Sequence, residues 1–326
     1  MDSMVLQLTK RGTAFLDPAV NLGRLRSEFS QRHCIRIPQM IDPTLLEQIQ
    51  PSLDISAFRK VTYEDVRISE LCMVENSASL LLYFLANDRR LFSILEEITG
   101  CAPIRCFQGR VYCRMPGESG GESWHDDCVQ GRLIGMSIHL GRHPFRGGLL
   151  QIREAASKKI VAEVANTGFG DAVLFRIATH LQHQNTETGG AVPKWAFAGW
   201  FQSEPDFLGA LREALSSGEG PSRRHFSDEG RPAGQRAWRV EPRLNQEIVC
   251  RAIGEELLLF NPRDNSFFLL NPVGRRIWEL LAEERGVEEV VSRLKEEYDV
   301  DPQLLREDIE GHLEAFHASG LFQGVG

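Results

Sequence analysis

Two histidines and an aspartate have the side-chain types and the spacing to hold a metal ion. If the backbone is extended at His125 and Asp127, these two side chains point to the same face of the strand. A later apolar run at 170–177 is followed by His180 and His183, either of which offers a third ligand. Two imidazoles and one carboxylate with open positions form the facial arrangement that holds non-haem Fe(II).

A cation, Lys194, begins the strand-like segment 194–201. The order His125-x-Asp127, a distant His and then a basic residue resembles the iron and 2-oxoglutarate-dependent oxygenases of the double-stranded β-helix fold. The resemblance implies Fe(II) as cofactor, with 2-oxoglutarate and O2 as co-substrates. It also implies that Lys194 pairs with the distal carboxylate of 2-oxoglutarate. Ala196 stands where many relatives have a serine, which leaves a second contact with that carboxylate unfilled.

The same resemblance suggests which distal histidine binds the metal and which tyrosine contacts the co-substrate. The sequence separation between His183 and Lys194 is closer to the family's spacing than the separation between His180 and Lys194. We therefore favour His183 as the ligand. His180 stays open as the ligand if the strand ends earlier. Relatives often carry an aromatic hydroxyl that contacts the co-substrate, and Tyr112 is the candidate for that role. A tyrosine of the barrel wall with its hydroxyl at the rim is the structural alternative.

Short strands separated by turns surround these residues. The patterns predict strands at 34–41, 105–114, 131–140 and 146–152, and helices at 20–32, 44–50 and 79–99. Several short strands at this spacing favour an antiparallel barrel or sandwich. The resemblance implies a jelly-roll, the double-stranded β-helix, with a helical support layer outside it. We assign this domain to residues 1–205.

The chain changes character after this domain. A short helix is predicted at 206–216, and residues 217–235 are rich in Gly, Ser, Pro and charge without an apolar period. Such a composition is typical of a linker. We therefore assign residues 206–239 to a helix and linker.

The composition is that of a globular protein. The chain has 326 residues, of which 42% are hydrophobic and 25% are charged, which allows one large domain and one small domain. We find neither a long uncharged apolar run nor a signal sequence, so we expect a cytoplasmic protein without a membrane partner. The seven cysteines include no C-x-x-C pair, which predicts reduced thiols.

A second pattern occupies residues 240–326. It predicts strands at 248–253, 257–260 and 266–270, and helices at 273–282, 287–298 and 303–319. Three strands followed by three helices make a small winged-helix-like domain. The run from Phe268 to Leu281, the segment 296–301 and the closing Gly320-Leu321-Phe322 resemble the PqqD family of peptide chaperones.

The PqqD resemblance implies that this domain recognises the leader of a ribosomally made precursor peptide. Recognition would occur by strand addition, in which the peptide pairs with an exposed sheet edge. By the same resemblance, the edge is the strand 266–270, with Phe267 and Leu269, and the groove wall is the helix around Leu305 and Ile309. Ordinary core positions are the structural alternative for each of these residues.

Charge separates this domain from the winged helices that bind DNA. Residues 240–326 contain 9 Lys and Arg against 18 Asp and Glu, whereas residues 1–239 contain 28 against 27. An acidic module repels phosphate, whose attraction supplies most of the non-specific affinity for nucleic acid. We therefore expect no nucleic-acid partner.

The two domains together predict an oxygenase that hydroxylates, or otherwise oxidises, a residue of a precursor peptide. Desaturation, epimerisation and cyclisation are the other oxidative outcomes. Three alternatives stay open: an oxygenase of a small molecule or free amino acid, a non-catalytic peptide carrier with a decayed barrel, and a zinc or structural site in a cupin-like protein. The oligomeric state is also open.

Overall fold

The chain divides into two compact units, Met1–Ala210 and Leu211–Gly326. The computed structural model describes residues 6–15, 22–54, 56–74, 76–117, 121–129, 131–206, 209, 242–298 and 301–323. The predicted helix at 206–216 and the predicted linker up to residue 239 lie almost wholly outside the described residues. Their limits therefore stay a prediction.

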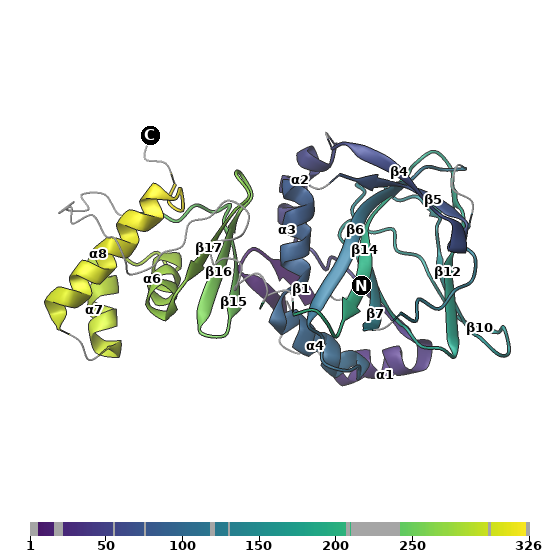
Figure 1. Cartoon of the computed structure of the whole chain (residues 1–326), viewed down its shortest axis with the longest axis horizontal. Coiled ribbons are helices and arrows are strands. Elements are labelled where there is room, and N and C mark those ends of the chain that lie inside the picture. Colours follow the sequence, from purple (N-terminus) through teal and green to yellow (C-terminus); the bar gives the residue numbers. More distant parts are fainter. Residues whose placement is uncertain are drawn as a thin grey trace. The chain divides into compact units, whose positions relative to one another are not determined.

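A seven-stranded antiparallel sheet forms the main wall of the first unit (Figure 1). Its strands, in order across the sheet, are β3 (Cys34–Ile37), β11 (Ala172–Arg176), β7 (Arg132–His139), β14 (Lys194–Gln202), β6 (Cys106–Arg114), β5 (Ile68–Met73) and β4 (Phe58–Tyr63). Strands β6 and β14 pair along their whole length, with Lys194 opposite Arg114. Because side chains alternate between the faces of a strand, Lys194 and Trp200 lie on the same face of β14.

A smaller sheet faces this main sheet. Its strands, in order, are β10 (Ile160–Val164), β9 (Leu150–Glu154) and β12 (Leu181–Asn185). Two further sheets have two strands each: β13 (Thr188–Gly189) pairs with β8 (Arg146–Gly147), and β1 (Leu6–Thr9) pairs with β2 (Gly12–Phe15). One apolar cluster joins the two sheets and contains Cys34, Val173 and Phe175 of the main sheet and Leu150, Ile152, Ala162 and Leu181 of the smaller one. This packing of two antiparallel sheets confirms the predicted jelly-roll architecture.

Helices support the other face of the main sheet, as predicted. They are α1 (Leu22–Arg32), α2 (Pro43–Asp54), α3 (Ser77–Ala86) and α4 (Arg89–Thr99), with a short 3-10 helix at Glu64–Val66. Tyr83 and Phe92 pack edge-on against Phe197 and Phe201 of β14, at ring-centroid distances of 5.5 and 6.0 Å respectively. No helix in the described part of the chain is long and apolar enough to cross a membrane.

The prediction of one continuous helix over 79–99 was wrong. The structure has two helices because Asp88 caps the second one, where its carboxylate accepts from two N–H groups of the first turn. The side chain of Asn87 makes two hydrogen bonds with the backbone of Phe107, at 2.8 and 3.1 Å. The break between the helices is therefore also the point where they are tied to β6.

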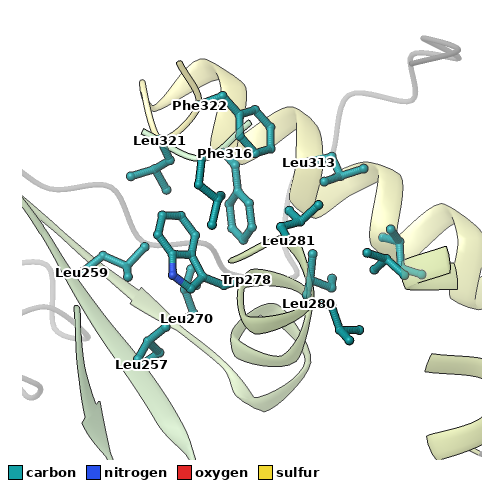
Figure 2. Packing of buried hydrophobic residues seen from close by; sticks show 14 of the residues in the cluster. Leu257, Leu259, Leu270, Trp278, Leu280, Leu281, Leu313, Phe316, Leu321 and Phe322 are labelled. Atoms are coloured by element: carbon teal, nitrogen blue, oxygen red, sulfur yellow. The ribbon is translucent and has the colours of Figure 1, made fainter. Parts of the chain in front are cut away.

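The described residues of the second unit form three strands followed by three helices, as predicted. They are β15 (Val249–Ile253), β16 (Glu256–Asn261), β17 (Ser266–Leu270), α6 (Pro272–Ala282), α7 (Val287–Glu297) and α8 (Pro302–Ala318). Figure 2 shows how Trp278, Phe316 and Phe322 point toward one another and toward Leu259 and Leu270 of the sheet. One apolar core thus joins the inner face of the sheet to all three helices.

The residues predicted to contact a peptide are all buried. Leu305 and Ile309 belong to the apolar core of this unit, and Ile309 has an exposed fraction of 0%. Both side chains therefore face the core, which agrees with the structural alternative, and do not line an open groove. Their contact with a peptide stays a prediction. Phe267 and Leu269 lie on the face of β17 opposite the core, because side chains alternate along a strand. In the sheet order β15-β16-β17, β17 is an edge strand.

Candidate active site

His125 and His183 face each other across a backbone bridge. The N–H of His125 donates to the carbonyl of His183 at 3.1 Å, and the N–H of His183 donates to the carbonyl of His125 at 2.7 Å. The centroids of the two imidazole rings lie 4.3 Å apart. The bridge joins the loop after β6 to strand β12, so the backbone itself places the two imidazoles side by side.

Asp127 completes the cluster, but not from an extended strand. Its φ is 56°, in the left-handed region, so the condition of an extended backbone is not met at this residue. The turn brings the carboxylate to the histidines: Nε2 of His183 lies 3.2 Å from Oδ2, and Nε2 of His125 lies 3.9 Å from Oδ1. One ligand atom from each of the three residues lies within 4.8 Å of the others.

Neighbouring groups orient these ligand atoms. Nδ1 of His125 donates to the carbonyl of Ser123 at 2.7 Å, which leaves Nε2 for a metal. The carboxylate of Asp127 accepts from Nε1 of Trp200 at 2.7 Å and from Arg132 at 3.3 Å. Burial raises the pKa of Asp127, but the hydrogen bonds to its carboxylate outweigh burial and lower the pKa. The two imidazoles and the ionised carboxylate form a donor set that fits Fe(II).

A glycine in the interior of a strand makes room for this cluster. Phe175 packs on His183 with ring centroids 4.6 Å apart, and the residue opposite Phe175 on β7 is Gly135. A Cβ at Gly135 would lie 2.1 Å from the phenyl ring. Sequence reasoning missed Gly135, although a glycine inside a strand often marks a close approach.

Lys194 is buried and lies at the start of β14. Its Nζ donates to the carbonyl of Gly148 at 3.1 Å and to Oδ1 of Asn185 at 3.0 Å. An ammonium group has three donors, so one is available to an incoming carboxylate. Burial, with a contribution from the nearby guanidinium of Arg114, lowers the pKa of Lys194 to about 7.

Two arginines and two glutamates form an ion network beside this ammonium. Glu70 accepts from Nη2 of Arg110 at 2.6 Å and from Nε of Arg114 at 2.9 Å. Glu122 pairs with Arg114 and accepts from Nδ2 of Asn185 at 2.7 Å. Burial raises the pKa of Glu122, but Arg114 and Asn185 lower it further, to about 2. When Lys194 is protonated, this ammonium and the two arginines face two glutamates. The group as a whole then has one excess positive charge.

A cavity of about 550 Å³ is lined by both the metal-ligand cluster and Lys194. Tyr112 also lines it and is buried, with its ring 5.0 Å from the guanidinium carbon of Arg114. Burial raises the pKa of Tyr112 to about 12, so its hydroxyl keeps its proton and can donate a hydrogen bond. Its contact with a co-substrate stays a prediction.

The structure brings His183, and not His180, to the other two ligands. His180 is exposed, and its ring lies 6.1 Å from the ring of His33. The cluster of possible metal ligands found among the described residues is His125, Asp127 and His183. The geometry thus favours the choice made from spacing, and the ligand role itself stays a proposal.

Comparisons with known proteins address each unit in turn. Residues 256–321 match the model of the family described as coenzyme PQQ synthesis protein D, PqqD. A solved structure of TbiB1 in complex with the TbiA(beta) leader peptide is 31% identical, with 26% of this chain and 98% of that chain covered and a TM-score of 0.25. A search of curated proteins found no match. The predicted resemblance is confirmed by the family model, and residues 256–321 form a PqqD domain.

Solved oxygenases are similar to the N-terminal part of the chain. A prolyl-4-hydroxylase from Pseudomonas putida is 12% identical, with 57% of this chain and 100% of that chain covered and a TM-score of 0.43. A 2OG-Fe(II) oxygenase family oxidoreductase from Burkholderia pseudomallei is 14% identical, with 58% and 94% covered and a TM-score of 0.44. The non-haem alpha-ketoglutarate-dependent epimerase SnoN is 15% identical, with 64% and 94% covered and a TM-score of 0.45.

The pKa of Lys194 generates a prediction for co-substrate affinity. Only the ammonium form attracts a carboxylate, and its pKa is lowered to about 7. Raising the pH above that value removes the charge, so we expect the affinity for 2-oxoglutarate to fall by up to about tenfold per pH unit. Anaerobic titration of the Fe(II)-loaded protein between about pH 7 and pH 9 measures this. Lys194→Arg keeps its charge and should flatten the profile, whereas a pH-independent wild type would contradict the prediction.

Gly135 generates a prediction for metal affinity. In Gly135→Ala the new methyl group overlaps the ring of Phe175, which must move against His183. We expect about 10- to 100-fold weaker Fe(II) binding, measured by competition with a chromophoric chelator. Gly189→Ala is the matched control, because a Cβ there meets nothing within 4 Å. Equal metal affinity in the two variants would show that the Phe175 ring does not support the cluster.

Proposed function

We propose that the first unit is an Fe(II)- and 2-oxoglutarate-dependent dioxygenase that hydroxylates, or otherwise oxidises, a residue of a ribosomally made precursor peptide. The observation that carries this proposal is that one cavity is lined by the His125, Asp127 and His183 cluster and by Lys194. 2-Oxoglutarate has a keto acid that chelates a metal and a distal carboxylate that needs a cation. The cavity offers a partner for each end.

The described side chains have distinct roles in this proposal. His125 and His183, through their Nε2 atoms, and Asp127 would hold the metal. Bound there with 2-oxoglutarate and O2, Fe(II) would supply the oxidising chemistry. Lys194 pairs with the distal carboxylate, and the protonated hydroxyl of Tyr112 is placed in the cavity wall to donate a hydrogen bond.

Proton transfer accompanies the binding of the distal carboxylate. Because the pKa of Lys194 is about 7, a part of the free protein holds the amine in its neutral form near neutral pH. A carboxylate next to the amine favours the ammonium form, so binding above pH 7 takes up a proton. The neighbouring ion pairs of Arg114 with Glu70 and Glu122 keep this end of the cavity polar.

The walls near the metal cluster are apolar. Leu150, Val173 and Phe175 line the cavity and belong to the apolar cluster between the two sheets. They exclude water from the space beside the ligands, which limits side reactions of a strong oxidant. The residue to be oxidised must therefore enter from the open side of the cavity.

The PqqD domain supports a peptide as the substrate. We infer that it binds the leader by strand addition to β17, whose side chains Phe267 and Leu269 lie on the face away from the core. Covalent attachment of the two units raises the effective concentration of the bound peptide at the oxygenase. This attachment explains why a recognition domain and a catalytic domain share one chain.

Anaerobic titration of the apo-protein with Fe(II) and 2-oxoglutarate tests the enzyme class. We expect the weak visible charge-transfer band of a chelated keto acid. Asp127→Ala should abolish the band, and Lys194→Ala should weaken 2-oxoglutarate binding roughly 10- to 100-fold, the size of a lost charged hydrogen bond. Lys159→Ala, at an exposed lysine, is the control and should leave the band unchanged. If the wild type gives no band, the carrier and zinc-site alternatives become the leading ones.

Hydrogen exchange tests the peptide-binding half of the proposal. Synthetic peptides translated from short reading frames beside the gene are the probes. Binding by strand addition should slow amide exchange in β17 while β15, the other edge strand of the same sheet, exchanges as before. Slower exchange in β15 alone, or no change with any of the peptides, would count against leader recognition at β17.

A further inference from the structure

Charge in the cavity is distributed in two separate regions. At one end, Lys194 and its neighbouring ion network have one excess positive charge, which matches the distal carboxylate of 2-oxoglutarate. Trp200 lies six residues further along β14, on the same face of the strand as Lys194. Asp127 and Arg132 lie at that second end, where Asp127 contacts both Trp200 and Arg132. Arg132 thus lies beside the metal-ligand cluster, whereas Lys194 lies beside the ion network.

Arg132 is a cation of the cavity wall that the proposed chemistry does not use. Its guanidinium carbon lies 3.5 Å from the ring centroid of Trp200, a stacked position that fixes the planar group. One nitrogen, Nη1, donates to Oδ1 of Asp127 at 3.3 Å. An arginine has five N–H donors, so the remaining donors of this fixed group can serve a ligand.

The other charged groups in this part of the wall are already engaged. Arg110 donates through both Nε and Nη2 to Glu70, at 3.0 and 2.6 Å. Asp126 accepts from the backbone N–H of Cys128 at 2.9 Å. Asp127 and a divalent metal would together have one positive charge, which matches the metal-bound carboxylate of 2-oxoglutarate. Arg132 pairs with Asp127 through Nη1 alone, so the rest of its guanidinium is available to a carboxylate of the substrate.

We propose that the residue presented to the metal carries a carboxylate, that of an aspartate or glutamate side chain, and that Arg132 binds it. This inference rests on the proposed function and names the class of substrate residue. The planar guanidinium matches a carboxylate with two parallel hydrogen bonds. Its stack on Trp200 holds it in place before the substrate arrives, which reduces the entropy lost on binding. Arg132 is thus a specificity residue at the open end of the cavity.

The test compares two capped pentapeptides, identical except for a central Asp or Asn, as probes. Their affinities are measured calorimetrically on the full chain loaded anaerobically with Fe(II) and 2-oxoglutarate. We expect the wild type to bind the Asp peptide about tenfold more tightly than the Asn peptide, the size of one charged hydrogen bond. In Arg132→Gln this preference should disappear. A role of Arg132 in orienting Asp127 alone would change both affinities equally and leave the preference unaltered.

Arg153→Gln is the matched control. Arg153 stacks on Trp124 with its guanidinium carbon 4.1 Å from the ring centroid, but it is not part of the cavity wall. This variant should keep the preference of the wild type. Equal binding of the two peptides by the wild type, no binding of either at millimolar concentration, or a preference that survives in Arg132→Gln would each overturn the inference. The charge-transfer band, recorded in the same samples, reports separately whether the metal and co-substrate site exists.

Discussion

The burial of charge inside the jelly-roll is the constraint on which the first unit depends. Glu70, Arg114, Glu122 and Lys194 all have little contact with solvent, and an unpaired charge in such a place costs several kcal/mol. Each therefore needs partners from a neighbouring segment. Glu70 on β5 joins two arginines of β6, and Glu122 joins β6 to Asn185 at the end of β12. The same ion pairs that position the cavity wall also tie the two sheets together.

This constraint also separates the two ends of the cavity. At the end near Lys194, cations and carboxylates are balanced to within one charge. At the other end, Trp200 and Arg132 donate to the carboxylate of Asp127, and the ring of Phe175 contacts the imidazole of His183. The Lys194 end is thus built from ion pairs, whereas the other end combines the Asp127–Arg132 ion pair with ring contacts. A cavity with two such ends can hold a small dianion and still present an open face to a larger molecule.

Spacing along the chain and the resemblance to the oxygenases were enough to propose His125, Asp127, His183 and Lys194, because their side-chain chemistry is distinctive. It was not enough for Glu70, whose arginine partners lie on another strand and leave no local pattern. The left-handed backbone at Asp127 could not be predicted for a related reason. It depends on contacts of the carboxylate with residues that are distant in the sequence. The break in the predicted helix had a local signal, the cap at Asp88, that the apolar periodicity concealed.

In the second unit, apolar periodicity predicted the order of strands and helices well, because one core and short turns decide it. The same periodicity could not distinguish a groove from a core. Leu305 and Ile309 have the spacing of either, and the structure places both in the core. A pattern of apolar positions thus indicates that a face is covered, but only packing shows whether a neighbouring helix or a bound peptide covers it.

The backbone bridge between His125 and His183 has a consequence for the stability of the whole first unit. A metal bound by side chains at both positions would act as a removable link between two segments that are far apart in the sequence. Because the site does not exist in the unfolded chain, the free energy of metal binding would add to the free energy of unfolding. The ion would then fasten the smaller sheet to the loop after β6, and the loaded and empty proteins would differ in how firmly that sheet is held.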